Sequence, residues 1–233
     1  VITTAATPHH PLPSAPSAPK RARIALLGAS GYSGQELARL VAGHPGLTLA
    51  CLVSREKAAG ASLLTGVDGR RHFAPPIITP EELPARLDEF DTLIACLPHG
   101  AFRTYLKEHS DLEQSPERII DLSADRRDGS DGYVYGFPEA FRSEIRSATR
   151  IANPGCYPTA AALALLPALE AGWIADPVMI HALSGVSGAG RTAALGTSFV
   201  ELDGGASLYR VGTVHTHVPE MERTFQRAAH AAR

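Results

Sequence analysis

Cys156 stands where a reactive thiol is expected. It follows a corner at Pro154 and Gly155 and precedes an apolar run to Leu169 with helical spacing. Pro158 suits the first helical turn, because no backbone donor is needed there. At a helix N-terminus, free N–H groups and the dipole favour the thiolate, which is the nucleophilic form. The segment therefore predicts a nucleophile at Cys156, and the alternative is a buried structural cysteine.

His215 and His217 are the next residues that could take part in chemistry. If their segment is a strand up to Pro219, the two imidazoles point to the same face. Such a pair can bind a metal, transfer protons or do neither. The neighbouring sequence offers no third ligand, so no metal site is expected. An imidazole takes up and releases protons near neutral pH, so either histidine is a candidate acid–base partner for a thiol.

A glycine-rich loop lies between an apolar run, residues 24–27, and a helical pattern over residues 35–41. Its glycines have the form GxxGxxG, a variant of the dinucleotide-binding fingerprint. The first glycine permits a tight turn, the second lets backbone approach a pyrophosphate, and the third lets the helix pack on the strand. The alternative is an ordinary strand-to-helix turn. The predicted cofactor-binding residues here are Gly28, Ala29, Ser30, Gly31, Tyr32, Ser33 and Gly34.

The end of the next predicted strand, residues 47–53, indicates which dinucleotide would bind. A strand that binds NAD usually ends in a carboxylate that accepts a hydrogen bond from the ribose 2′-OH. Here Ser54 and Arg55 follow instead. A hydroxyl and a guanidinium suit a 2′-phosphate, which favours NADP. The alternative is that Arg55 is only a solvated loop charge.

A second small-residue loop, residues 184–191, follows a predicted strand over residues 177–183. Its backbone N–H groups and the guanidinium of Arg191 are typical of an anion-binding loop. The alternative is a flexible linker, and the cation at the end of the loop favours binding.

Strands and helices alternate through the first two thirds of the chain. This alternation predicts an α/β fold with a parallel sheet and right-handed crossovers. Ligands then gather at the carboxyl ends of the strands, where Gly28, Ser54, Pro98 and Ser123 lie. The further predicted strands are residues 92–97 and 119–122, the further helices are 80–87 and 101–107, and residues 133–139 are predicted as a loop.

Composition narrows the class of protein. Hydrophobic residues make up 44% and charged residues 20%, as in soluble globular proteins, and a net charge of −2 provides no basic field for nucleic acid. Cys51, Cys96 and Cys156 are odd in number and widely spaced, which argues against a disulfide framework and suits a reducing compartment such as the cytoplasm. No apolar run approaches a membrane span. Residues 1–20 are rich in Pro and Ala and are predicted to be a disordered tail.

Seven motifs together carry a resemblance to a known family. They are GASGYSGQEL from Gly28, CLPHG from Cys96, DLSADRR from Asp121, YGFPEAFR from Tyr135, ANPGCYPTA from Ala152, SGVSGAGR from Ser184 and HTHVPEM from His215. The chain thereby resembles the N-acetyl-gamma-glutamyl-phosphate reductases of the semialdehyde dehydrogenase superfamily, over nearly all of residues 21–222. Phe137 and Thr216 depart from the common family residues, Leu and Arg, and neither is a catalytic position.

The resemblance implies a Rossmann-type NADP-binding domain over residues 21–155, followed by an α+β catalytic domain over residues 156–233. Family members continue well past this point, so the second domain is expected to be incomplete at its C-terminus. An incomplete second sheet would leave an exposed edge that favours association, so a homo-oligomer, dimer or tetramer, is expected. Net charge and the apolar runs predict no nucleic-acid or membrane partner.

The implied reaction is the NADPH-dependent reduction of N-acetyl-L-glutamyl 5-phosphate to the 5-semialdehyde and phosphate, through a thioester on Cys156. His217 is the implied acid–base residue and His215 its competitor, and Glu220 is a candidate to orient the imidazole. The predicted substrate-binding residues are Arg126, Asn153, Arg191, His215 and Glu220, and Ser187 and Gly188 join the cofactor site.

Two other interpretations compete with this one. An aspartate-semialdehyde dehydrogenase, or its aminoadipate-pathway counterpart, would run the same chemistry on another acyl phosphate. A binding module that keeps the nucleotide fold and lacks turnover is the alternative outside catalysis.

Overall fold

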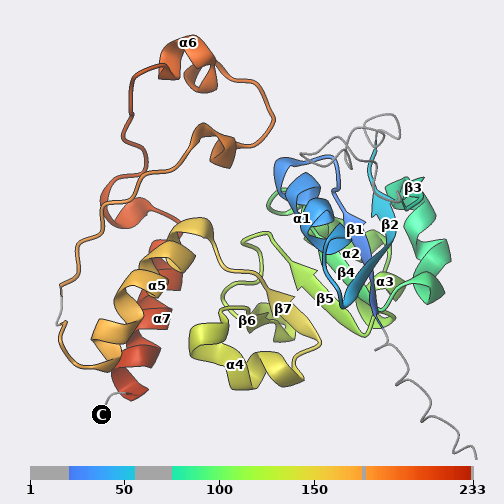
Figure 1. Cartoon of the computed structure of the whole chain (residues 1–233), viewed down its shortest axis with the longest axis horizontal. Helices are drawn as coiled ribbons and strands as arrows, with labels where there is room; N and C mark the ends of the chain where they lie inside the picture. The colour runs from blue at the N-terminus through green and yellow to red at the C-terminus, as the bar shows by residue number, and fades with distance from the viewer. Residues whose placement is uncertain (1–20, 56–74, 175–176, 232–233) are drawn as a thin grey trace, which may run out of the picture.

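The computed structural model describes residues 21–55, 75–174 and 177–231, so the predicted tail at residues 1–20 lies outside the described residues. The described strands form one parallel sheet in the order β3-β2-β1-β4-β5-β7-β6 (Figure 1). The strands are β1 (Ala22–Leu27), β2 (Leu47–Val53), β3 (Ile77–Ile78), β4 (Thr92–Ala95), β5 (Arg118–Asp121), β6 (Val134–Tyr135) and β7 (Arg150–Ala152). The predicted α/β fold with a parallel, Rossmann-type sheet is confirmed.

Helices connect these strands and continue beyond the sheet. The α-helices are α1 (Tyr32–Ala42), α2 (Ala101–Glu108), α3 (Asp111–Gln114), α4 (Pro138–Ser147), α5 (Cys156–Glu170), α6 (Phe199–Leu202) and α7 (Val218–Ala231). The 3-10 helices are η2 (Pro80–Glu89), η3 (Ser130–Gly132), η4 (Val186–Ala189), η5 (Leu195–Thr197) and η6 (Gly212–Val214).

Strand β1 lies between β2 and β4 and is buried on both faces. Its side chains alternate, as the two-residue period of a strand requires. Ala25 and Leu27 pack in one cluster with Phe102 of α2, whereas Ile24 and Leu26 pack in the other with residues of α1. Burial on both faces explains why the central strands are continuous apolar runs in the sequence.

Helix α5 carries Cys156 at its first position, and it packs beside α7 (Figure 1). Leu166 and Leu169 of α5 share a third apolar cluster with Phe141 of α4, and Phe225 of α7 packs against it. This cluster packs α7 against α4, α5 and Tyr135 of β6. Segments more than sixty residues apart therefore meet at the N-terminus of α5.

The segment between α5 and α7 differs from its prediction. Residues 177–183 form no strand; they have no regular secondary structure and are largely exposed, and no neighbouring strand pairs with them among the described residues. Residues 211–217 are also not a strand: η6 (Gly212–Val214) and a turn lead into α7, which begins at Val218. His215 and His217 therefore do not share the face of a strand as predicted, although their rings still lie only 5.0 Å apart.

The segment predicted as a loop at residues 133–139 also contains regular structure. Val134 and Tyr135 form strand β6, which pairs in parallel with β7, and α4 begins at Pro138. Strand β7 was not predicted, since its three residues carry too short a pattern to distinguish from a loop.

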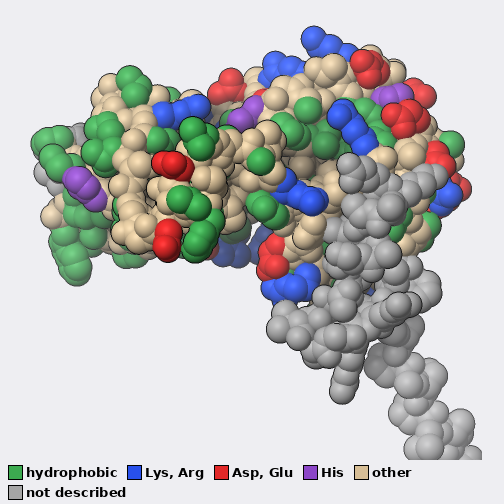
Figure 2. Space-filling model, turned by 90° about the horizontal axis from the view of Figure 1, so that it is seen from above, with side chains coloured by type: hydrophobic (Ala, Val, Ile, Leu, Met, Phe, Trp, Pro, Cys, Tyr) green, Lys and Arg blue, Asp and Glu red, His purple; other side chains and the backbone are tan. Residues whose placement is uncertain are grey.

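Between residues 177 and 214 the surface is unusually apolar. Met179, Leu183, Phe199 and Val200 are among its exposed side chains, and Figure 2 shows hydrophobic side chains over this end of the molecule. Among the described ranges of the chain, no helix combines the length and the apolar character needed to cross a membrane.

Candidate active site

The loop after β1 has the close backbone contacts that its glycines predict. Gly28 adopts φ +87°, and a Cβ there would lie 2.6 Å from the carbonyl oxygen of Cys96. A Cβ on Gly34 would lie 2.3 Å from the carbonyl oxygen of Gly28. Gly31 caps the N-terminus of α1, so the unpaired N–H groups of that helix face the carboxyl end of the sheet. Such a helix start suits a pyrophosphate.

This loop yields a prediction with a matched control. Gly28→Ala should lower the free energy of unfolding by clearly more than Gly100→Ala. Both glycines have positive φ, which costs an alanine roughly 1–2 kcal/mol. Only Gly28 adds a backbone clash, whereas a Cβ on Gly100 meets nothing within 4 Å. Urea unfolding of the two variants measures the difference, and equal losses would contradict the tight packing of this loop.

The residues after β2 lie at the same edge of the sheet. Ser54 is buried, and its backbone N–H donates to the carbonyl of Ile78 at 3.0 Å. Arg55 is exposed beside it. The carboxyl ends of β1 and β2 are paired, so these residues lie next to the glycine loop.

Cys156 is exposed at the first position of α5 and lines a cavity of about 620 Å³. The same cavity is lined by Ser33 of the glycine-rich loop, and by Arg127, Asn153 and Thr159. The cavity therefore extends from the thiol to the glycine-rich loop. This placement fits a nucleophile and excludes the buried structural cysteine that was the alternative.

Burial disfavours thiolate formation at the other two cysteines. It raises the pKa of Cys51 to about 11 and that of Cys96 to about 12. Only the thiolate is an effective nucleophile, so both groups are inert near neutral pH. Cys156 is the exposed thiol of the three.

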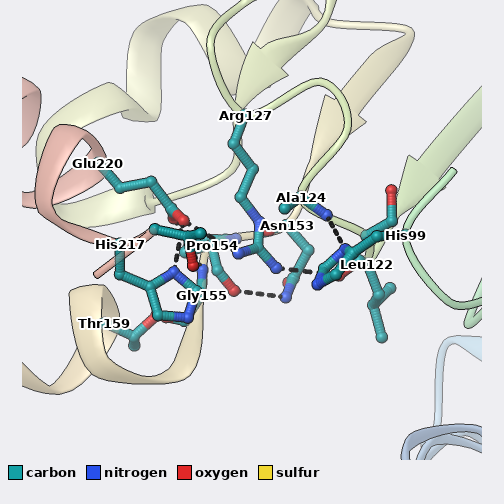
Figure 3. A network of polar contacts seen from close by, with 12 residues as sticks. His99, Leu122, Ala124, Arg127, Asn153, Pro154, Gly155, Thr159, His217 and Glu220 are labelled. Atoms are coloured by element: carbon teal, nitrogen blue, oxygen red, sulfur yellow. Dashed lines mark hydrogen bonds and ion pairs between the residues drawn. The ribbon is translucent and has the colours of Figure 1, made fainter. Parts of the chain in front are cut away.

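The carboxylate of Glu220 accepts four hydrogen bonds close to the start of α5. Oε1 lies 3.0 Å from Arg127 Nη1 and 2.7 Å from His217 Nδ1. Oε2 accepts from the Tyr135 hydroxyl and from the backbone N–H of Gly155, both at 3.0 Å. Figure 3 shows this carboxylate between Arg127 and the imidazole. A carboxylate has about four lone-pair positions, so these contacts saturate it.

These partners keep Glu220 ionised despite its burial. Burial alone would raise the pKa of this carboxyl, but His217, Arg127 and the Gly155 N–H together lower it to about 2. An ionised carboxylate can only accept hydrogen bonds. His217 must therefore carry a proton on Nδ1. In the neutral ring, the Nε2 lone pair can then accept a second proton.

His215 has the opposite arrangement. Its Nδ1 lies 3.1 Å from the backbone nitrogen of His217 and accepts that N–H. The proton of the neutral ring is then on Nε2, which is buried without a hydrogen-bond partner in the described part of the chain. Burial, followed by the charges of His217 and Arg210, lowers the pKa of His215. The ring is therefore a poor proton acceptor.

Glycine at position 155 lets His217 approach the helix start. A Cβ there would lie 2.4 Å from Cε1 of His217 and 2.9 Å from Nη1 of Arg127. The imidazole and the guanidinium thus pack against the residue that immediately precedes Cys156.

Two tyrosines next to these groups were not predicted from the sequence. The Tyr157 ring lies 5.4 Å from that of His215 and 6.2 Å from that of His217, both edge-on. Hydrogen bonding with Tyr157, reinforced by burial, raises the pKa of Tyr209 to about 12. Tyr157 lies inside the ANPGCYPTA motif, directly after Cys156, but no role was predicted for it, and none of the seven motifs contains Tyr209.

Of two adjacent arginines, the structure brings Arg127 to the cavity. Arg126, which was the predicted substrate-binding residue, is buried away from it. Its guanidinium forms ion pairs with Asp121 at 3.4 Å and Asp131 at 3.2 Å and lies over the Tyr133 ring. A guanidinium that is already paired with two carboxylates has little charge left to bind a substrate, so this geometry does not support substrate binding by Arg126.

The remaining predicted residues lie either in the cavity or on the loop of residues 184–191. Asn153 lines the cavity, and its Nδ2 donates to the carbonyl of Pro154 at 3.0 Å. Arg191 donates to the carbonyl of Ser30, so the 184–191 loop reaches the glycine-rich loop. Ser187 and Gly188 lie in η4 and are exposed, with no described contact to the cavity residues.

Comparison with protein families gives two matches. The model described as "Semialdehyde dehydrogenase, NAD binding domain" matches residues 23–148, which is more than half of the chain. The model described as "Semialdehyde dehydrogenase, dimerisation domain" matches residues 156–233.

Curated relatives extend the match. A Magnetococcus marinus protein named N-acetyl-gamma-glutamyl-phosphate reductase is 39% identical over 88% of this chain and 63% of its own length. A Rhodospirillum rubrum protein of the same name is 40% identical over 86% of this chain and 62% of its own. The chain thus spans less than two thirds of the length of these relatives.

A solved aspartate semialdehyde dehydrogenase with NADP, from Candida albicans, has a TM-score of 0.49 at 17% identity and covers 66% of this chain and 48% of its own. The resemblance that the motifs indicated is confirmed by the family and sequence matches. The chain belongs to the semialdehyde dehydrogenase family.

Proposed function

We propose that the whole protein reduces N-acetyl-L-glutamyl 5-phosphate to N-acetyl-L-glutamate 5-semialdehyde and phosphate. The observation that carries this proposal is the position of Cys156. Cys156 is exposed at the start of α5 and lines a cavity that Ser33 of the dinucleotide loop also lines. It directly follows Gly155, which packs against His217. The names of the curated relatives support the choice of substrate.

The residues of the site suit a covalent route. The Cys156 sulfur attacks the acyl carbon, the bond from that carbon to the phosphate oxygen breaks, and a thioester and free phosphate result. His217 takes the thiol proton on Nε2, while the Glu220 carboxylate stabilises the imidazolium through Nδ1. After reduction of the acyl carbon, the carbon–sulfur bond breaks, the aldehyde leaves and the thiolate is restored.

The glycine-rich loop fits a dinucleotide, because side chains are excluded at Gly28 and Gly34 and the α1 N-terminus faces the sheet edge. Residues 28–34 with Ser54 and Arg55 would hold it, and Arg191 of the second loop, which also carries Ser187 and Gly188, contacts the glycine-rich loop at Ser30. When bound, the reduced nicotinamide supplies the hydride. The choice of NADP over NAD rests on Ser54 and Arg55 in place of a carboxylate.

Arg55→Ala tests the cofactor choice. This variant is expected to raise the KM for NADPH much more than the KM for NADH, because only NADPH carries the 2′-phosphate that a guanidinium would bind. Initial rates with each cofactor measure the two constants. Equal effects on both cofactors would contradict the 2′-phosphate role and favour a solvated loop charge.

Activity on competing substrates tests the reaction itself. NADPH oxidation is followed with N-acetylglutamyl phosphate, aspartyl phosphate and the aminoadipate-pathway acyl phosphate, or in reverse with each semialdehyde and phosphate. The proposal expects the largest kcat/KM with the N-acetylglutamyl compound. A preference for another acyl phosphate would assign the chain to a related semialdehyde dehydrogenase, and no turnover with any would favour a binding module.

We also propose that the protein is a cytoplasmic homo-oligomer, dimer or tetramer. The match of residues 156–233 to a dimerisation domain supports association. So do the exposed apolar side chains between residues 177 and 214, which a second copy could cover.

A further inference from the structure

Arg127 makes three contacts that join separate parts of the chain. Its Nε donates to the carbonyl of Asn153 at 2.8 Å, and Nη2 donates to the carbonyl of Leu122 at 3.0 Å. Its Nη1 donates to Glu220 Oε1 at 3.0 Å, across 93 residues of sequence. Both carbonyls belong to the backbone at the carboxyl ends of β5 and β7, so the guanidinium is held rigidly at the sheet edge.

Tyr135 holds the other oxygen of the same carboxylate. Its hydroxyl donates to Glu220 Oε2 at 3.0 Å, and its ring packs edge-on against Phe141 at 5.5 Å. Arg127, Tyr135 and Glu220 are all buried. A buried carboxylate is costly unless it is paired and hydrogen-bonded, so these two donors add to the contacts from His217 and Gly155 that hold Glu220 in place.

Glu220 in turn contacts His217 and Gly155, the residue that directly precedes Cys156. Its Oε1 holds Nδ1 of His217, and its Oε2 holds the backbone N–H of Gly155, the residue that caps the Cys156 helix. A displacement of this carboxylate would therefore move both the imidazole and the start of α5.

We propose that Arg127 and Tyr135 are positioning residues, which fix the Glu220 carboxylate and through it the His217 ring and the start of the Cys156 helix. The inference rests on the proposed function for the roles of His217 and Cys156. A merely structural role, in which these contacts only attach α7 to the sheet, is the competing explanation.

The test is the rate of Cys156 alkylation by iodoacetamide across the neutral pH range, quantified by mass spectrometry of the Cys156 peptide. The variants are Arg127→Met, Arg127→Lys, Tyr135→Phe, Glu220→Gln and the double variant Arg127→Met/Glu220→Gln. Glu144→Gln is the matched control, because it breaks the ion pair with Arg227 of α7 and leaves Arg227 stacked on Phe141, the ring that packs against Tyr135. The titratable and charged groups that contact Glu220 and His217 are Arg127, Tyr135, His215 and Tyr157, with Arg210 and Arg223 further out.

Arg127→Met is expected to slow alkylation at pH 7 about tenfold, the size of effect that one charge-assisted hydrogen bond can have. Without its cation, buried Glu220 tends to take up a proton, so His217 loses the anion that stabilises its protonated form. The rate–pH curve then moves to higher pH. Arg127→Lys should restore part of the rate, since it keeps the charge but not the planar fork.

The double variant should react no more slowly than Glu220→Gln alone, because Arg127 acts through that carboxylate. An unchanged or faster rate in Arg127→Met, or effects that add in the double variant, would overturn the proposal and favour the structural role. If Arg127→Met does not fold, Tyr135→Phe takes its place, because it removes only one hydroxyl. A shift of its rate–pH curve for Cys156 alkylation to higher pH supports the proposal, and an unchanged curve overturns it. Alkylation requires neither nucleotide nor acyl phosphate, so a chain without reductase activity would contradict the proposed function and leave this test intact.

Discussion

Replacing Cys156 by serine is expected to lower the turnover of acyl-phosphate reduction by about a thousandfold or more, the range seen when an enzyme loses its nucleophile. A serine hydroxyl is far less acidic than a thiol, so little of it is ionised near neutral pH. The exposed position of Cys156 at the N-terminus of α5 is kept in the variant, because serine is close to cysteine in size. The expected loss therefore reports chemistry rather than folding, and circular dichroism of the variant checks this.

Cys51→Ala is the control for the role of this particular thiol. Cys51 is completely buried in the core, and burial raises its pKa to about 11, so it is not a nucleophile near neutral pH. This variant is expected to lose some stability through a small cavity but to retain its turnover. A Cys156→Ser enzyme with a near-normal rate would rule out the thioester route.

The local part of this site could be predicted from the sequence. The helix begins at Cys156 as its flanking Pro and Gly residues indicate, and the glycine spacing gives both the turn at Gly28 and the close packing at Gly34. These features depend on residues that are near neighbours in the chain. Turn and capping preferences are therefore sufficient to predict them.

The contacts across the chain could not be predicted in this way. Arg126 and Arg127 are adjacent and of the same type, and only the path of the backbone after β5 directs the second into the cavity and buries the first between two aspartates. Tyr135 likewise meets Glu220 only because β6 and α7 come together in the fold. The spacing of residue types along the chain does not indicate which distant side chains will meet.

The predicted strand at residues 177–183 shows a different limit. Its apolar residues fit a strand, but a strand needs a hydrogen-bonded neighbour, and pairing partners are a property of the whole fold. Met179 and Leu183 instead remain exposed. The apolar pattern of this segment therefore did not predict its conformation.

His217→Asn is expected to lower kcat by about a hundredfold to ten-thousandfold, the usual range for the loss of a general acid–base residue. The structure distinguishes His217 from His215 by hydrogen bonding. Nδ1 of His217 faces an ionised Glu220, which leaves Nε2 able to accept a proton, whereas Nδ1 of His215 is occupied by the backbone N–H of His217. Asparagine can keep the contact to Glu220 but cannot accept and return a proton at the position of Nε2.

His215→Asn makes the comparison decisive. Since the pKa of His215 is lowered chiefly by burial, this ring stays neutral and is expected to affect packing and KM more than kcat. The pH dependence of kcat should therefore lose its acidic limb in His217→Asn and keep it in His215→Asn. If the limb disappears instead with His215, the proton is carried by the other imidazole, and the Glu220 contact only anchors the helix. The pH profiles of kcat for the two variants therefore decide whether Glu220 contributes to catalysis through His217 or only stabilises the fold.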